Sequence, residues 1–195
     1  MFKRKYFLPA ITVLLIIIAV LGCSAAKPRS MPADLKGVHT YLATGTVDVA
    51  FSPNGGITEM IVNEISNAKQ SIQVQAYSFT SPEIIKALIS AKKRGVDVKI
   101  IIDKSNVTGQ QKEKALLDSI VAAGIPMKVD SDFQIAHSKI IILDGINVVT
   151  GSFNFTNSAE HNNAENCLIL HGNKPLADQY VKNWQWRWNE TALYK

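Results

Sequence analysis

The sequence predicts an α/β fold in which a mixed β-sheet is flanked by helices on both faces. From residue 47 onward, short runs rich in β-branched residues alternate with segments whose apolar residues recur at helical spacing. Such alternation is typical of a sheet that is covered by helices on both faces. Two of the runs, residues 140–143 and 148–150, are separated by the turn dipeptide Asp144-Gly145, which predicts an antiparallel hairpin and therefore a mixed sheet.

The individual elements follow from local signals. Ser81 and Pro82 are placed as the N-cap and the first residue of a helix, which Gly95 ends. Residues 103–110 are expected to form a loop and residues 156–163 a helical turn. In chain order, the expected strands are residues 47–51, 71–77, 96–102, 127–129, 140–143, 148–150 and 167–170, and the expected helices are residues 57–68, 82–94, 112–123 and 175–189.

The chain of 195 residues has room for one domain, at residues 46–195, preceded by a targeting segment and a tether. Residues 1–26 combine a positive start, sixteen mostly apolar residues at 6–21 and a group of small residues, as a signal peptide does. The apolar run is slightly short of the roughly 20 residues that span a bilayer, although the small residues extend it. Residues 27–45 contain two prolines and two glycines and are expected to be a tether with little regular structure.

The end of the apolar run leaves three fates open for this segment. The residues V-L-G-C at 20–23 resemble the bacterial lipoprotein box, in which Cys23 would be lipidated, although Leu21 stands where a small residue is commoner. The segment is therefore cleaved and lipidated at Cys23, cleaved to release a soluble domain, or retained as a membrane anchor. All three alternatives place the domain outside the cytoplasm, in a bacterial periplasm or cell envelope.

The overall charge does not by itself indicate a nucleic-acid-binding protein. The net charge is +5, but three of these charges are Lys3, Arg4 and Lys5, and the rest of the chain has 18 basic and 16 acidic residues, a balance of +2. The two cysteines, Cys23 and Cys167, are not arranged as a C-x-x-C pair, so we predict neither a structural disulfide nor a metal site.

A polar motif surrounds the predicted hairpin. His137, Lys139 and Asp144 have the spacing H-x-K-x4-D, and residues 151–154 read G-S-F-N, that is G-S-x-N. Because residues two apart in a strand point to the same face, the imidazole of His137 and the ammonium of Lys139 are expected to project together. A lone histidine on a strand is usually structural and a lysine at a strand end is usually a solvated tip, but the two together with G-S-x-N indicate a catalytic site.

This combination resembles the phospholipase D superfamily, whose signature is H-x-K-x4-D followed by G-S-x-N. The resemblance extends to Glu165-Asn166 and to residues 77–80 and 91–100, and it is strongest to the single-motif bacterial endonucleases of the Nuc type. It runs from about residue 47 to residue 188. It implies a phosphodiesterase that needs no metal or other cofactor, forms a phosphohistidine intermediate and works as a homodimer, because the chain carries one motif copy.

The resemblance also assigns roles to six residues of the candidate catalytic site. It implies that His137 is the nucleophile, and that Glu165 bonds the other nitrogen of this histidine. The substrate phosphate would be bound by Lys139, Ser152 and Asn154. Asp144 completes the signature; because it begins the hairpin turn, we expect its side chain to bond backbone groups and not the substrate.

The leading functional hypothesis is an extracytoplasmic, metal-independent endonuclease acting on DNA or RNA, with DNA preferred. A phospholipase D-type enzyme acting on phospholipid is the nearest alternative, since a membrane tether would hold the site close to headgroups. A nucleic-acid-binding module without catalysis is the third. Two tryptophans of the last helix, Trp184 and Trp188, share a face and are expected in the core, with Trp186 on the other side.

Overall fold

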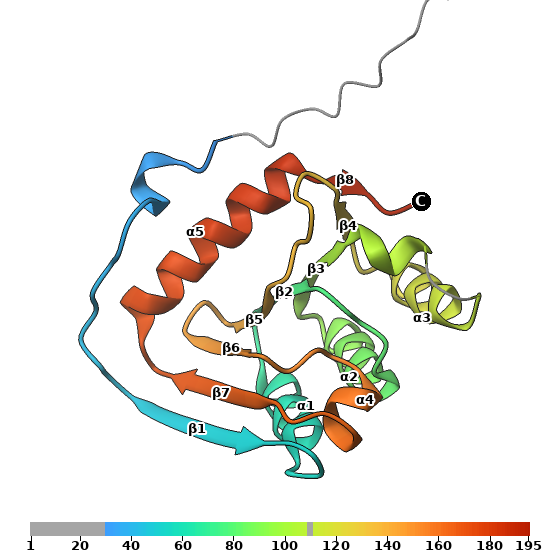
Figure 1. Ribbon diagram of the computed structural model, residues 1–195, viewed down its shortest axis with the longest axis horizontal. Helices are drawn as coiled ribbons and strands as arrows, with labels where there is room; N and C mark the ends of the chain where they lie inside the picture. The colour runs from blue at the N-terminus through green and yellow to red at the C-terminus, as the bar shows by residue number, and fades with distance from the viewer. Residues whose placement is uncertain (1–29, 109–110) are drawn as a thin grey trace, which may run out of the picture.

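A computed structural model describes residues 30–108 and 111–195, and it contains a single mixed β-sheet (Figure 1). The predicted targeting segment, with Cys23, lies outside the described residues. The strands stand in the order β1-β7-β6-β5-β2-β3-β4-β8. Their bounds are β1 Thr46–Phe51, β2 Ser71–Ala76, β3 Asp97–Asp103, β4 Met127–Asp130, β5 Lys139–Leu143, β6 Asn147–Gly151, β7 Asn166–His171 and β8 Ala192–Leu193.

The sheet combines a parallel part with an antiparallel part, which confirms the mixed sheet predicted from the sequence. Strands β2, β3 and β4 run parallel to one another, whereas β1, β7, β6, β5 and β2 form antiparallel neighbours. Because of this arrangement, one end of the sheet brings together the last residues of β2, β3 and β6 and the first residues of β5 and β7. The polar motif residues other than Asp144 lie at this end of the sheet.

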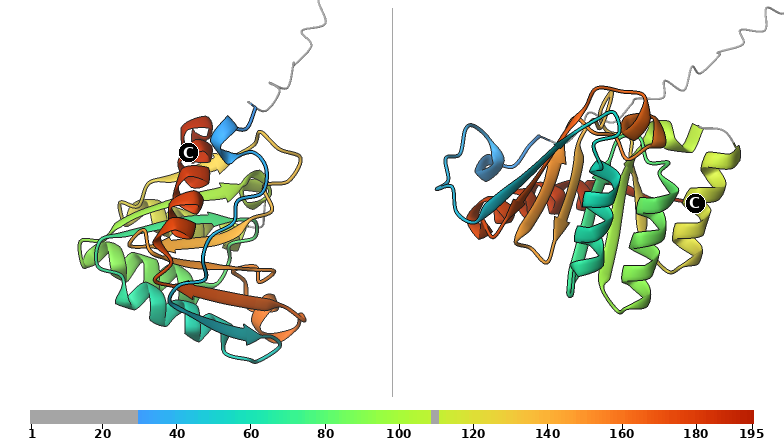
Figure 2. Two further views of the ribbon diagram at one scale, coloured as in Figure 1. Left: turned by 90° about the vertical axis from the view of Figure 1, so that its left-hand side faces the viewer. Right: turned by 90° about the horizontal axis from the view of Figure 1, so that it is seen from below.

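Helices cover both faces of the sheet, as the sequence predicts (Figure 2). One face packs against α1 Ile57–Asn67, α2 Pro82–Lys93 and α3 Gln111–Ala122, and the other against α5 Lys174–Glu190. An apolar core lies on each face of the sheet, and β3 contributes side chains to both. Ile100 and Ile102 face the three helices, while Ile101 packs with Trp184 of α5. Trp184 is buried and stacks on Trp188 with ring centroids 4.9 Å apart, as expected for two residues on one helix face.

Two local features differ from the sequence-based expectation. The expected loop after β3 contains a 3-10 helix, η2 Lys104–Thr108, and the short helix α4 Asn157–His161 forms the expected helical turn. The short strand β8 was not predicted; it pairs with β4 through backbone bonds such as Tyr194 N to Met127 O. Its two residues offer too short a pattern to recognise.

The described part of the predicted tether, from residue 30, lies along α5 (Figure 1). It contains one 3-10 turn, η1 Ala33–Leu35, and is otherwise without regular structure. Tyr41 Oη donates to Gln179 Oε1, and the side chain of Asn173 donates to the carbonyl of Leu42. Within the described residues, no helix has the length and apolar character needed to cross a membrane.

Helix α5 leaves the β1 end of its sheet face uncovered. Val47, Val49 and Phe51 of β1 point to this face and are 55%, 55% and 64% exposed. They pair with residues 170, 168 and 166 of β7, of which the first two are half-buried leucines. The result is an apolar stripe at the edge of the molecule, which we call the β1 stripe.

Candidate active site

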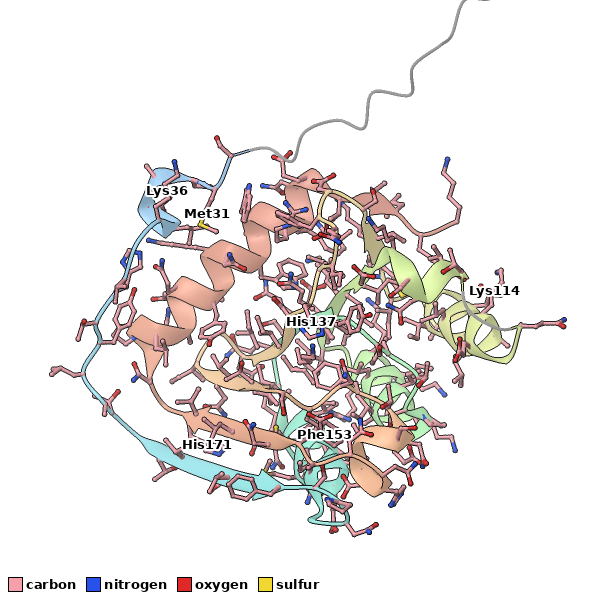
Figure 3. The ribbon with its side chains drawn as sticks, viewed as in Figure 1. Met31, Lys36, Lys114, His137, Phe153 and His171 are labelled. Atoms are coloured by element: carbon pink, nitrogen blue, oxygen red, sulfur yellow. The ribbon has the colours of Figure 1, made fainter. Side chains whose placement is uncertain are left out.

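His137, which Figure 3 labels, lies beside Lys139 where β5 begins. His137 stands two residues before Lys139 and is exposed, whereas Lys139 is the first residue of the strand and only 6% exposed. The Lys139 ammonium donates a hydrogen bond to the backbone carbonyl of His137, with an N–O distance of 2.6 Å. The Lys139 ammonium is therefore held against the backbone of His137.

The ring of Tyr77 contacts both side chains. Its centroid lies 4.6 Å from that of the His137 imidazole, at an interplanar angle of 54°, and 5.1 Å from the Lys139 ammonium. Tyr77 follows β2, whose last residue Ala76 pairs with Lys139 of β5. Tyr77 falls within the family resemblance at residues 77–80, but no role was predicted for it, because its contact with His137 depends on the non-local pairing of β2 with β5.

The G-S-x-N segment reaches the site from the end of β6. Gly151 has a φ of 153°, and a Cβ atom there would lie 2.3 Å from the carbonyl oxygen of Asn166, so only glycine fits. Ser152 donates to Glu165 Oε2 at 2.6 Å and accepts from the backbone N–H of Asn166 at 3.1 Å. The side-chain oxygen of Asn154 is buried and has no hydrogen-bond partner among the described residues.

Glu165 belongs to the site, but its carboxylate bonds partners other than His137. Oε2 accepts the hydrogen bond from Ser152, and Oε1 accepts one from the Asn163 side chain at 3.1 Å. Burial lowers the pKa of the Lys139 ammonium, and the negative charge of Glu165 opposes this by raising it. In this structure Glu165 therefore acts electrostatically on Lys139.

Ser52 fixes the backbone that carries Glu165. Its hydroxyl donates to the carbonyl of Asn163 at 2.9 Å and accepts from the N–H of Glu165 at 3.1 Å. Its own N–H donates to the carbonyl of Glu165 at 3.0 Å. Ser52 stands 113 residues before Glu165, in a segment interpreted from the sequence as a turn, and no local signal marks this role.

Asp144 lies at the opposite end of β5 from Lys139, roughly 15 Å away at the usual rise of a strand. Its carboxylate accepts hydrogen bonds from the backbone N–H groups of Lys69, Gln70 and Ser71 at distances from 2.7 to 3.2 Å. The expected side-chain-to-backbone bonding is present, but it joins the hairpin to the segment between α1 and β2 instead of closing the turn itself. Burial raises the pKa of this carboxyl, and the three backbone donors and the charge of Lys69 outweigh it, holding the pKa below its usual range.

A polar cleft of about 480 Å³ opens beside the motif. Hydroxyl and amide side chains line most of it, among them Ser78, Thr80, Asn106, Asn154, Thr156 and Asn163. Asn106 holds this wall in place, since it donates to the carbonyl of Tyr77 and accepts from the N–H of Phe79. In residues 30–108 and 111–195, no three His, Cys, Asp or Glu side chains are grouped so that they could hold a metal ion.

An imidazole and an ammonium on one aromatic ring, beside a polar cleft that Tyr77 and Asn154 line, make an arrangement suited to a phosphodiester substrate. The protein-family model described as "Cardiolipin synthase, PLD-like domain" matches residues 61–188. The chain belongs to the phospholipase D superfamily, as its motifs indicate.

Similar proteins carry related names. The chain is 43% identical over 143 residues to "Phospholipase D" of Rickettsia prowazekii (strain Madrid E), an alignment that covers 73% of this chain and 68% of the relative. It is 29% identical over 127 residues to "Mitochondrial cardiolipin hydrolase" of Xenopus laevis, over 65% of this chain and 59% of the relative. Among solved structures, Nuc from Salmonella typhimurium, a phospholipase D family member, matches with a TM-score of 0.74 and 46% identity, over 77% of this chain and 98% of Nuc.

Proposed function

We propose that this phosphodiesterase is an endonuclease that cleaves DNA, and also RNA, without a metal ion. The observation that carries the proposal is the polar cleft lined by Asn154 and by Tyr77, whose ring contacts His137, because hydroxyl and amide groups suit a sugar–phosphate backbone and not an acyl chain. The 46% identity to Nuc, over almost the whole of that protein, supports the same choice.

The reaction proceeds in two displacements on phosphorus. A neutral His137 imidazole attacks, the N–P bond forms, and the P–O bond to the leaving sugar oxygen breaks as a second histidine donates a proton to that oxygen. Water then attacks the phosphohistidine, the N–P bond breaks and the second histidine takes back a proton. Lys139 and Asn154 hold the phosphoryl oxygens, and this positive charge fills the place that a metal ion has in other phosphodiesterases.

The second histidine comes from a second copy of the chain. Of the other histidines, His161 is bonded through Nδ1 to Asn54 and lines a separate pocket with Gly56 and Glu83. A two-fold axis at the motif would place two copies of His137 on one phosphate. The β1 stripe supports association, because a second copy would bury apolar side chains that α5 leaves exposed.

The domain acts outside the cytoplasm, in a bacterial periplasm or cell envelope. Residues 1–26 support this, with either the apolar run or a lipid on Cys23 as the membrane attachment, or with cleavage releasing the domain. Residues 27–45 then connect the attachment to the enzyme.

A phospholipid substrate is the second candidate, and the relatives named phospholipase D and cardiolipin hydrolase favour it.

The nucleic-acid and phospholipid substrates are distinguished by one assay. The full chain, in mild detergent, is incubated with plasmid DNA, RNA and phosphatidylcholine vesicles, each with and without chelator. We expect cleavage of the nucleic acids in both conditions and none by His137→Asn. Cleavage of the lipid alone, or activity lost with chelator and restored by Mg²⁺, would contradict the proposal.

A further inference from the structure

A second cleft, of about 400 Å³, lies beside Tyr77 and is distinct from the polar cleft. It is bordered by η2 and by the residues that lead into His137, and Tyr77 lines both clefts. Its lining includes Tyr77, Asp103, Lys104, Val107, Gln134 and Ile135. We call it the side cleft. Because the Tyr77 ring contacts His137, the side cleft ends next to the proposed nucleophile.

Two apolar side chains of the side cleft are exposed to solvent. Val107 is 44% and Ile135 is 50% exposed, and they come from the two different segments that border the cleft. Apolar side chains beside a cationic site indicate a ligand with apolar surface. Lys104 and Gln134 add a cation and an amide to the same lining.

The side cleft is held open by a buried carboxylate. Asp103, 2% exposed, accepts from Ser105 N at 2.8 Å on one oxygen and from Ala136 N at 2.7 Å on the other. It thereby ties η2 to the residue preceding His137. Lys104 donates to the carbonyl of Phe133 at 2.8 Å, a second bond between the two borders. The cleft is therefore formed before a ligand arrives.

We propose that the side cleft binds an unpaired nucleobase of the nucleotide next to the scissile phosphate, an assignment that rests on the proposed nuclease function. A base has apolar faces for Val107 and Ile135 and a polar edge for Gln134, whereas an acyl chain has no such edge. The volume lies within the range of small-ligand sites. Because a paired base stays stacked within its duplex, the enzyme prefers single-stranded or locally opened substrate.

The test compares two single-stranded DNA oligonucleotides that have the same sugar–phosphate backbone, one with bases and one with abasic residues throughout. The full chain is assayed as wild type, Val107→Ser, Ile135→Ser and the control Val121→Ser, which changes a valine 43% exposed on α3. For wild type and the control, we expect KM to be about fivefold to tenfold lower for the strand with bases. The two cleft variants should lose most of this difference while kcat on the abasic strand stays unchanged, which shows that His137 has not moved.

Each outcome decides the assignment. Equal KM values for the two strands in the wild type, or cleft variants that behave like Val121→Ser, would reject the base site and leave the nuclease function standing. A fall in kcat on the abasic strand without a change in base preference would mean that these residues support His137 and do not bind a base. A wild-type enzyme that cleaves phosphatidylcholine vesicles but neither strand would reject the proposed function and this inference together.

Discussion

At the scale of single residues, His137 and Lys139 form one unit with Tyr77. The imidazole rests against the Tyr77 ring, and the ammonium is held between that ring and the His137 carbonyl. This contact desolvates Lys139 while leaving His137 exposed. An exposed imidazole beside a buried cation suits the proposed attack on a phosphate whose charge the cation neutralises.

Replacing His137 tests the nucleophile. His137→Asn should lower turnover on plasmid DNA by at least roughly 10³-fold, because attack and proton donation are both lost when two copies meet. The fold should be retained, since the side chain is exposed and sits outside the core. Turnover is measured by plasmid nicking and folding by the melting temperature. Near-normal cleavage by a well-folded variant would remove His137 from the mechanism.

Replacing Glu165 tests its electrostatic effect on Lys139. The negative charge of Glu165 raises the pKa of Lys139, against the lowering caused by burial. Glu165→Gln should therefore lower the pKa of the ammonium further, so that the alkaline loss of kcat/KM begins at a lower pH than in the wild type. The amide keeps the hydrogen bonds with Ser152 and Asn163 within reach. An alkaline limb that stays in place or moves upward would show that Lys139 does not sense this charge.

The motif residues could be predicted from the sequence, but the residues that contact them and hold them in place could not. His137, Lys139, Ser152, Asn154 and Glu165 are separated by few residues, and one hairpin followed by a strand brings them to one edge of the sheet. Tyr77 and Ser52, in contrast, reach the site through pairings of β2 with β5 and of β1 with β7. Such long-range pairings leave no local pattern, so residues that depend on them could not be found.

At the scale of elements, the hairpin of β5 and β6 is fixed at both ends. The catalytic end is held by contacts to Tyr77 and Glu165, and the far end by Asp144. Asp144 and Gly145 both have positive φ, at 52° and 64°, as a tight hairpin turn requires. The signature aspartate thus contributes to the position of β5, and through β5 to the position of Lys139.

The Asp144→Asn variant tests this structural role. Asparagine accepts positive φ and keeps one acceptor oxygen, but it loses the charge that binds three backbone N–H groups. The free energy of unfolding of the variant should be about 1–2 kcal/mol lower than that of the wild type near pH 7. The folded fraction of the variant should keep its activity. Chemical denaturation and cleavage assays of the same sample measure the two effects. A folded but inactive variant would instead assign Asp144 to catalysis.

The pH dependence of this difference follows from the lowered pKa of Asp144. A carboxyl whose pKa is lower in the folded state stabilises the fold above its unfolded pKa, and this stability is lost as the pH falls through the folded value. The wild-type advantage over Asp144→Asn should thus be full at neutral pH and shrink below about pH 4, near the ordinary value of 3.8. A gap that stays constant down to about pH 2 would exclude the charge as its source.

Most elements were predictable because their signals are local. The apolar periodicity of α1 and α2, the Ser81 cap and the Asp144-Gly145 turn all act within a few residues, and the structure bears them out. The cap is seen directly, since the Ser81 side chain accepts from the N–H of Ile84. The strand order was not predictable, because the first strand pairs with the seventh through contacts more than a hundred residues apart.

At the scale of the whole molecule, the proposed chemistry needs two histidines at one phosphate, and each chain carries one H-x-K-x4-D motif. His161 is bonded to Asn54 at a separate pocket and His171 is bonded to Asp48, so the proposal assigns the proton donor to a second copy of His137. The unit of activity would then be a dimer, with the β1 stripe buried on association. If two subunits share one active site, activity depends on which subunits pair. If each subunit has its own site, activity does not depend on the pairing.

Mixing wild type with His137→Asn distinguishes a shared site from independent ones. The two proteins are unfolded together in equal amounts and refolded, with wild type refolded alone at the same total concentration as the control. Random pairing leaves roughly one quarter of the dimers with two copies of His137, so activity should fall to about a quarter of the control. Independent sites would leave about half, because each wild-type chain would act alone. The variant changes one exposed side chain and should not bias the pairing. Activity at half, or an active species with the mass of one chain by light scattering, would reject the shared site.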